Sequence, residues 1–90
     1  MRNEDYLKAI SDSVEAILGK KFEVSAQHKM IGDVGMESID VIDFLHEIER
    51  RVGIEVRIPL LLEQMHKSGG RRFDQLTAQD LINYLQNAKK

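Results

Sequence analysis

The chain has 90 residues and a formal net charge of −2, from 13 Lys and Arg against 15 Asp and Glu. This length predicts a single domain over residues 1–90, and the 42% share of hydrophobic residues is typical of a globular core. The lack of Cys excludes a disulfide scaffold, a thiolate metal site and a cysteine nucleophile. No apolar run approaches the ~20 residues of a membrane span, and residues 1–5 lack a signal-peptide core. We therefore expect a soluble, cytoplasmic domain without integral membrane association.

Residues 5–18 carry their apolar side chains on one stripe of a helical repeat. The stripe consists of Leu7, Ile10, Val14, Ile17 and Leu18. Asn3, Glu4 and Asp5 supply an N-cap and an acidic first turn, and Gly19 follows where a C-terminal glycine belongs. This segment is predicted to be a helix.

Residues 20–37 show no sustained period, which predicts a long loop. Apolar residues are scattered through it, namely Phe22, Val24, Met30, Ile31, Val34 and Met36. Loops of this length in a compact domain are usually functional or mobile. The apolar residues indicate that this loop is pinned onto the core.

A second helical stripe runs through residues 38–52. Its members are Val41, Phe44, Leu45, Ile48 and Val52. Gly53 ends this predicted helix, and residues 54–58 then alternate between apolar and charged side chains. The alternation fits either a short strand, paired with residues 22–24, or an extended loop with three inward side chains.

A third helix is predicted over residues 59–67, because Pro59 is well placed as its first residue and Gly69 and Gly70 follow its end. Arg71 and Arg72 then form a basic link, which we expect to be exposed.

Thr77 and Asp80 resemble a capping box that opens a closing helix. The apolar stripe of that helix is Leu81, Tyr84, Leu85 and Ala88. Together the patterns predict an all-α fold. It is a small antiparallel four-helix bundle, with three main helices and a short one, and a long loop after the first helix.

Ile39 points away from the predicted core. With Val41 at zero on a wheel of 100° per residue, Ile39 falls near 160° and Ile42 near 100°. Single exposed apolar residues are common, so this placement alone fits either chance exposure or a docking contact. Asp43 and Glu47 flank Ile39, which suits a basic partner, although early acids and late bases also complement the dipole of a helix.

Ser38 lies where the long loop turns into the second helix, directly after Glu37. Capping a helix is a common use of serine. A phosphate esterified to an exposed hydroxyl at this position would lie in the positive field of the helix N-terminus. The position therefore suits an attached phosphodiester.

Residues 35–42, Gly-Met-Glu-Ser-Ile-Asp-Val-Ile, resemble the acyl carrier protein signature that opens the second helix of that family. The resemblance extends over almost the whole chain. It includes the amphipathic first helix, the loop residues Ile31 and Val34, the run 48–56, and residues 73–85, which resemble the last two helices of the family. The resemblance implies that a phosphopantetheinyl transferase joins 4′-phosphopantetheine to Ser38, and that the thiol of this arm carries acyl groups as thioesters.

By the same resemblance, partner enzymes that load, elongate or transfer acyl groups read one face of the second helix. The residues of this face are Glu37, Ile39, Asp40, Ile42, Asp43 and Glu47. The chain itself would be no enzyme, because the chemistry belongs to the prosthetic group and its client enzymes. We expect a monomer that binds no nucleic acid.

Three features depart from the family pattern. Glu37 stands where Asp is usual, the net charge is only −2, and the stretch before Phe73 is longer than in common fatty-acid carriers. Residues 54–72 also hold more bases than acids, which partners could read. These features favour a specialised carrier in a lipid, lipopolysaccharide or secondary-metabolite pathway, although a longer loop is also tolerated without function.

Other chemistries fit the sequence less well. His46 lies eight residues from Ser38, about 12 Å along a helix, and the glycine that follows the serine in a nucleophile elbow is absent, so no catalytic residue is predicted. His28, His46 and His66 match no zinc spacing, so no metal site is predicted. Two alternatives to the acyl carrier stay open, namely a peptidyl carrier and an unmodified helical interaction module.

Overall fold

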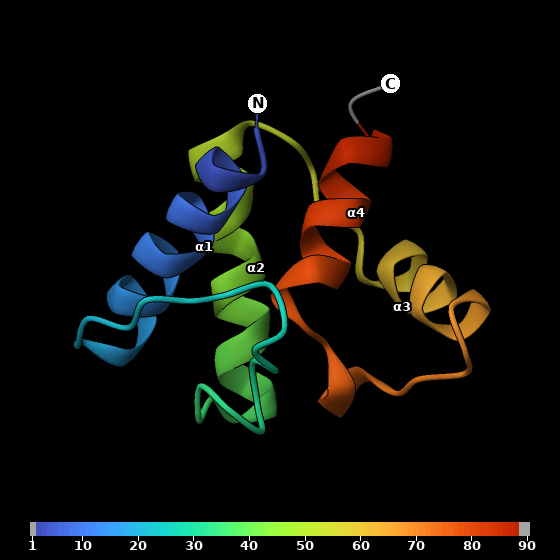
Figure 1. The fold of residues 1–90 in the computed structure, drawn as a ribbon, viewed down its shortest axis with the longest axis horizontal. Helices are drawn as coiled ribbons and strands as arrows, with labels where there is room; N and C mark the ends of the chain where they lie inside the picture. Colours follow the sequence, from blue (N-terminus) through green and yellow to red (C-terminus); the bar gives the residue numbers. More distant parts are fainter. Residues whose placement is uncertain (1, 89–90) are drawn as a thin grey trace.

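The computed structural model describes residues 2–88, which form four α-helices and one 3₁₀ turn (Figure 1). In chain order these are α1 (Asn3–Leu18), α2 (Ser38–Val52), α3 (Ile58–Lys67), η1 (Phe73–Gln75) and α4 (Ala78–Ala88). α1 runs antiparallel to α2 and α4 and contacts both, while α3 lies beside α4 (Figure 1). The predicted all-α bundle with a long loop after the first helix is confirmed. No helix among residues 2–88 combines the length and the apolar character that crossing a membrane requires.

α1 is amphipathic and ends where the sequence predicts. Its fully buried side chains are Tyr6, Ile10, Ser13 and Val14. Gly19 has a φ of 74° and terminates the helix in the left-handed conformation that glycine adopts without strain. The start differs from the prediction, because Arg2 is the N-cap and Asn3 is already helical. The Arg2 N–H donates to Asp5 Oδ2 at 2.9 Å, so Asp5 supplies the oxygen that Asn3 was expected to provide.

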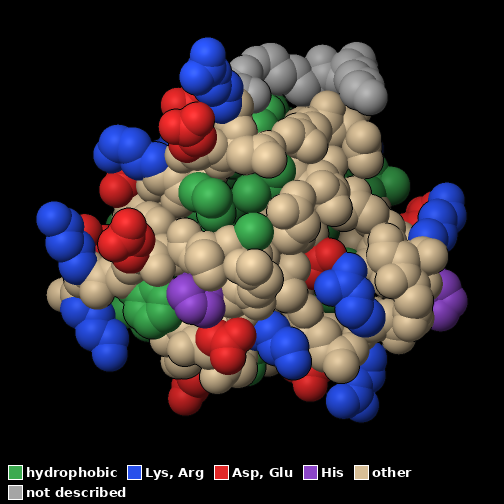
Figure 2. Space-filling model, viewed as in Figure 1, with side chains coloured by type: hydrophobic (Ala, Val, Ile, Leu, Met, Phe, Trp, Pro, Cys, Tyr) green, Lys and Arg blue, Asp and Glu red, His purple; other side chains and the backbone are tan. Residues whose placement is uncertain are grey.

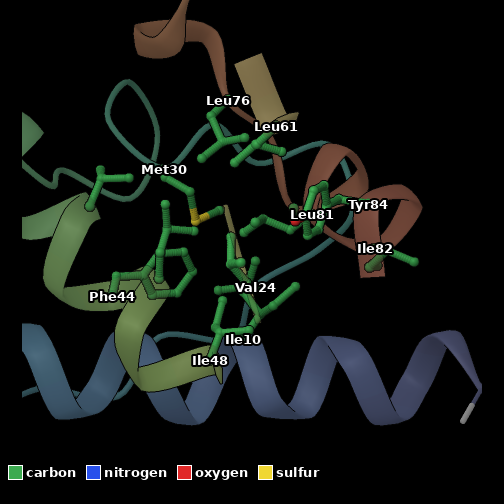
Figure 3. Packing of buried hydrophobic residues seen from close by; sticks show 14 of the residues in the cluster. Ile10, Val24, Met30, Phe44, Ile48, Leu61, Leu76, Leu81, Ile82 and Tyr84 are labelled. Atoms are coloured by element: carbon green, nitrogen blue, oxygen red, sulfur yellow. The ribbon is translucent and has the colours of Figure 1, made fainter. Parts of the chain in front are cut away.

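The long loop between α1 and α2 is held on the core by side chains and backbone together. Its predicted anchors Val24, Met30, Val34 and Met36 are buried, and Phe22 and Ile31 are half-buried. The N–H of Met30 donates to the carbonyl of Leu76 at 2.9 Å, and the N–H of Ala78 donates to the carbonyl of His28 at 3.1 Å. Figure 3 shows Met30 and Leu76 projecting into the same cluster as Phe44. The chain therefore reaches α2 along a defined path.

Residues 54–57 lie between α2 and α3 and pair with no strand in the described part of the chain. The N–H of Val56 donates to Glu49 Oε1 at 2.7 Å, and the N–H of Arg57 donates to the hydroxyl of Tyr84 at 3.0 Å. These side chains satisfy the donors that a neighbouring strand would otherwise take. The strand interpretation of residues 54–58 is therefore wrong, and the extended-loop interpretation is confirmed.

α3 begins one residue earlier than predicted, at Ile58, so that Pro59 is its second residue. A proline in the first turn costs no hydrogen bond, because the N–H groups there have no partner within the helix.

The link after α3 is only partly the exposed basic segment that the sequence predicts. Arg72 is exposed, but Arg71 is half-buried and forms an ion pair with Asp80, in which Nη1 lies 2.9 Å from Oδ2. Asp80 also completes the predicted capping box, since its N–H donates to Thr77 Oγ1 at 3.2 Å and its carboxylate accepts the Thr77 N–H at 2.9 Å. A carboxylate that is 4% exposed needs such partners, which explains why Arg71 turns inward.

Candidate functional site

The turn before α2 carries the chain outward at Ser38. Gly35 has a φ of 92°, a conformation that favours glycine. Met36, two residues before the helix, is buried, and its N–H donates to the carbonyl of Met30 at 3.1 Å, which fixes this end of the loop to the core. Glu37 is exposed and extended and serves as the N-cap of α2. Ser38 is therefore the first helical residue, and its side chain is exposed.

Ser38 does not cap α2. The interpretation of Ser38 as an N-cap serine, which its sequence position allowed, is therefore wrong. Asp40 closes the first turn instead, with its Oδ2 accepting the N–H of Glu37 at 3.1 Å. The first backbone bond of the helix runs from the N–H of Val41 to the carbonyl of Glu37 at 3.1 Å. Within residues 2–88 the Ser38 hydroxyl has no hydrogen-bond partner. The Ser38 side chain is thus exposed and takes part in no cap of α2 among the described residues.

The surroundings of Ser38 suit an anion esterified to its oxygen. The first N–H groups of a helix have no carbonyl partner within it, and the helix dipole adds a partial positive charge at the same end. Both effects favour a phosphodiester at this position. The carboxylate of Asp40 is already engaged with the Glu37 N–H, which limits its repulsion of such a group. The residues present therefore fit a group attached through a phosphodiester.

The two predicted apolar contacts of the partner face both reach the surface. Ile39 is 67% exposed and Ile42 is 41% exposed, and Asp43 next to Ile42 is exposed as well. On the opposite side of the helix, Phe44 and Ile48 are completely buried. The wheel drawn from the sequence thus assigns the inner and outer faces of α2 correctly.

Two acidic residues of the predicted partner face are engaged within α2. Glu47 accepts hydrogen bonds from Arg50 Nη2 at 2.8 and 2.7 Å, and Arg51 Nη2 lies 3.4 Å from its Oε1. The hydrogen bond from Arg50 lowers the pKa of Glu47. Asp40 is occupied by the helix cap. The spacings of three and four residues from Glu47 to the two arginines are the signal by which the sequence could have revealed this pairing.

The basic residues of segment 57–72 are all paired with carboxylates. The pairs are Arg57–Glu55, Lys67–Glu63, Arg71–Asp80 and Arg72–Asp74. Figure 2 shows acidic and basic side chains intermixed across the face in view. Three of these pairs are exposed and stabilise the fold little, whereas the Arg71–Asp80 pair is largely buried. All four cancel the local excess of positive charge. The segment therefore offers partners a mixed surface rather than a basic patch.

The three histidines lie on separate elements, as the sequence predicts. His28 is in the long loop, where its Nδ1 accepts the N–H of Ser25 at 2.9 Å, while His46 is on α2 and His66 on α3. Residues 2–88 contain no cluster of three or more histidine or carboxylate side chains that could hold a metal ion.

A family model described as the phosphopantetheine attachment site matches residues 8–66. The match covers more than half of the chain and contains the whole of α2 with Ser38. Comparisons with curated proteins and with solved structures find no match. Carrier domains of this family interact with phosphopantetheinyl transferases and partner enzymes, and they are not catalytic themselves. The chain belongs to the phosphopantetheine attachment site family, and its prosthetic group is a covalently attached 4′-phosphopantetheine.

Proposed function

We propose that this chain is an acyl carrier, which holds acyl groups as thioesters on a 4′-phosphopantetheine arm attached to Ser38 and presents them to partner enzymes. The observation that supports this best is the exposed hydroxyl of Ser38, which has no partner within residues 2–88 and opens α2 inside the matched range. When bound, the prosthetic group supplies a thiol on a long flexible chain. The protein needs that thiol because it has no Cys of its own.

The residues around Ser38 then have separate tasks. Ser38 Oγ loses its proton and attacks the phosphorus of a pyrophosphate-linked phosphopantetheine donor, so that the P–O–P bond of the donor breaks and a nucleotide phosphate leaves. Oγ becomes the ester oxygen, and the N-terminus of α2 favours the negative charge of the phosphodiester. Ile39 and Asp43 form an exposed recognition surface beside Ser38, one apolar and the other acidic. The buried Met36 and the capped first turn of α2 hold this recognition surface in one orientation.

The acidic side chains at the start of α2 favour an acyl cargo over a peptidyl one. The stretch of residues 54–72 before Phe73, which is longer than in common fatty-acid carriers, favours a specialised pathway for a lipid, a lipopolysaccharide or a secondary metabolite. A monomeric state and a cytoplasmic location stay predictions of this proposal.

The attachment is tested by coexpressing the chain with a broad-specificity phosphopantetheinyl transferase and measuring the intact mass. We expect the wild type to gain the mass of one prosthetic group, and Ser38→Ala to gain none. Ser68→Ala is the matched control, because Ser68 is also an exposed serine, at the C-cap of α3, and should leave the gain unchanged. An unmodified wild type would favour the helical interaction module, and a gain that persists in Ser38→Ala would place the arm elsewhere.

The cargo class is tested separately with the modified protein. Loading reactions with acyl donors should form a thioester, whereas aminoacyl donors should not. Preferential loading by aminoacyl donors would identify a peptidyl carrier instead.

A further inference from the structure

The loop that follows α1 folds back across this helix (Figure 1) and leaves a groove between α1 and segment 21–24. The groove consists of two adjoining hollows of about 350 and 330 Å³, which share Ser11 and Glu23. Along α1 it extends from Glu4 to Glu15, which is about 16 Å at 1.5 Å per residue. We call it the α1 groove. None of its lining residues belongs to α2, so the attachment site does not explain it.

The floor of the α1 groove is apolar, and its walls are fixed in the free chain. Leu7 and Phe22 are half-buried there, so each keeps part of its apolar surface in solvent. The N–H of Val24 donates to Ser11 Oγ at 3.1 Å, which fastens the loop to α1. An edge contact between the rings of Phe22 and His28, with 5.3 Å between their centroids, restrains the Phe22 side chain. A groove that is formed in advance binds a partner at little cost in conformational entropy.

The rim of the α1 groove carries an excess of negative charge. Its lining residues include four acids against two lysines, a local net charge of −2. Glu4, Glu15 and Glu23 are exposed, and their carboxylates form no ion pair or hydrogen bond within residues 2–88. One of the two lysines, Lys8, is already paired with Asp12 at 3.2 Å. The groove therefore presents three unpaired carboxylates and one unpaired lysine to a partner.

The stability of α1 does not explain Glu15. This residue lies in the last turn of α1, where the negative end of the helix dipole disfavours an acid, and that turn contains no base. Glu4 differs, because an acid in the first turn complements the dipole. Arg51 of α2 lines a hollow together with Glu15 but pairs with Glu47 instead, at 3.4 Å. The negative charge of Glu15 is thus unfavourable in the free chain, and a bound cation would offset it.

We propose that the α1 groove binds a cationic amphipathic helix of a partner protein. The apolar side chains of that helix lie on Leu7 and Phe22. Its Lys or Arg side chains reach the carboxylates of Glu15 and Glu23. A groove about 16 Å long accommodates about three turns of such a helix, at 5.4 Å per turn. The same carboxylates would repel an anionic lipid surface, which therefore fits the groove less well.

Binding in the α1 groove leaves Ser38 accessible, because the groove contains no residue of α2. A partner held there keeps the chain close while other enzymes act at Ser38, since tethering raises the local concentration of the tethered groups. The inference goes beyond the proposed function and does not depend on it. The groove is the same whether or not Ser38 carries a prosthetic group.

The experiment is an NMR titration of the full chain with a synthetic helical peptide. The peptide has about 15 residues, with leucines at helical spacings of three and four and lysines on both flanks of that stripe. We expect the resonances of residues 4–15 and 21–24 to shift. The double variant Glu15→Lys with Glu23→Lys should raise Kd about 10-fold or more, because two attractions become repulsions. Both residues are exposed, so the variant should keep the fold.

Three controls separate the α1 groove from a general attraction between opposite charges. The double variant Asp43→Lys with Glu63→Lys makes the same change of net charge at exposed positions on α2 and α3, and its Kd should stay within about twofold of the wild type. Ser38→Ala should bind the peptide as the wild type does. A peptide with serines in place of its leucines should bind about 10-fold more weakly or worse, because it buries no apolar surface.

The outcomes decide the proposal independently of the carrier function. Equal weakening by the two double variants would mean that only net charge matters, and shifts confined to α2 would place the peptide elsewhere. Either result, or no binding at all, overturns the proposal and leaves the carrier function intact. A chain that binds the peptide in the α1 groove but stays unmodified at Ser38 would instead support the proposal and contradict the carrier function.

Discussion

The guanidinium of Arg71 lies against the carboxylate of Asp80, with Nη1 2.9 Å from Oδ2, and ties the link after α3 to the first turn of α4. The same carboxylate accepts the N–H and the hydroxyl of Thr77, at 2.9 and 3.0 Å. The backbone carbonyl of Asp80 accepts Gln64 Nε2 from α3 at 3.0 Å. The hydrogen bond to Asp80 raises the pKa of Arg71. Asp80 therefore joins α3, the link and α4 through a single buried residue.

Asp80→Asn should destabilise the protein by about 2–4 kcal/mol, because Arg71 loses its charged partner and the cap of α4 weakens. Urea unfolding measures the change. Asp74→Asn is the control, since the Asp74–Arg72 pair is exposed at 3.5 Å and its loss should cost less than about 0.5 kcal/mol. Equal losses in the free energy of unfolding for the two variants would show that the buried Arg71–Asp80 pair stabilises the fold no more than the exposed pair does.

Ser38→Ala should change the free energy of unfolding by less than about 0.5 kcal/mol, because the Ser38 hydroxyl has no hydrogen-bond partner within residues 2–88. Thr77→Ala should cost about 1 kcal/mol, because Thr77 Oγ1 accepts the N–H of Asp80 at 3.2 Å and is a true N-cap. Thermal or urea unfolding of both variants checks this contrast. A loss near 1 kcal/mol for Ser38→Ala would mean that its hydroxyl caps α2 in solution.

Ile39→Ala should leave the stability nearly unchanged and raise the KM of the transferase, since Ile39 is 67% exposed beside Ser38. Phe44→Ala should instead cost about 3–5 kcal/mol, because Phe44 is completely buried in the core (Figure 3). Unfolding curves and modification kinetics of the two variants test the assignment of faces. A clear loss of melting temperature in Ile39→Ala would contradict the placement of that side chain.

The stability of the protein should fall as the pH drops below about 4.5, in part through Glu47. The hydrogen bond from Arg50 lowers the pKa of Glu47 below its ordinary value of 4.5. A carboxylate with a lowered folded-state pKa stabilises the fold above its unfolded pKa, and this contribution is lost as the pH falls through the folded pKa. Comparing wild type with Glu47→Gln by urea unfolding from pH 3 to 7 checks the sign. The two curves should converge at low pH, and parallel curves would contradict the assignment.

The helices could be predicted closely because the signals that form them are local. The apolar stripe of α2 lies within that helix, and Gly53 marks its end with a φ of 72°. Periodicity and terminal residues act over a few positions, so the range Ser38–Val52 follows from the sequence alone. The acyl carrier signature is also a short continuous run, and the family match confirms the membership that it implied.

The partners of side chains were harder to predict because distant segments have to meet first. The sequence leaves residues 54–58 open between a strand and a loop, and the choice depends on Tyr84, almost 30 positions away, and on Glu49. Arg71 follows a serine and two glycines, so from the sequence it resembles an exposed base in a loop. Only the fold brings Asp80 of α4 next to it.

The sequence by itself determined the four helices, the outward side of Ile39 and the family of the chain, because period, end residues and a continuous motif need no tertiary contact. Only the tertiary structure decided that Glu37 and Asp40 close the first turn of α2, which leaves Ser38 free to receive the arm. It also decided that Arg71 is half-buried and that its guanidinium pairs with the carboxylate of Asp80. Burial and hydrogen bonding depend on which groups come within about 3 Å of each other, and only the folded backbone sets those distances.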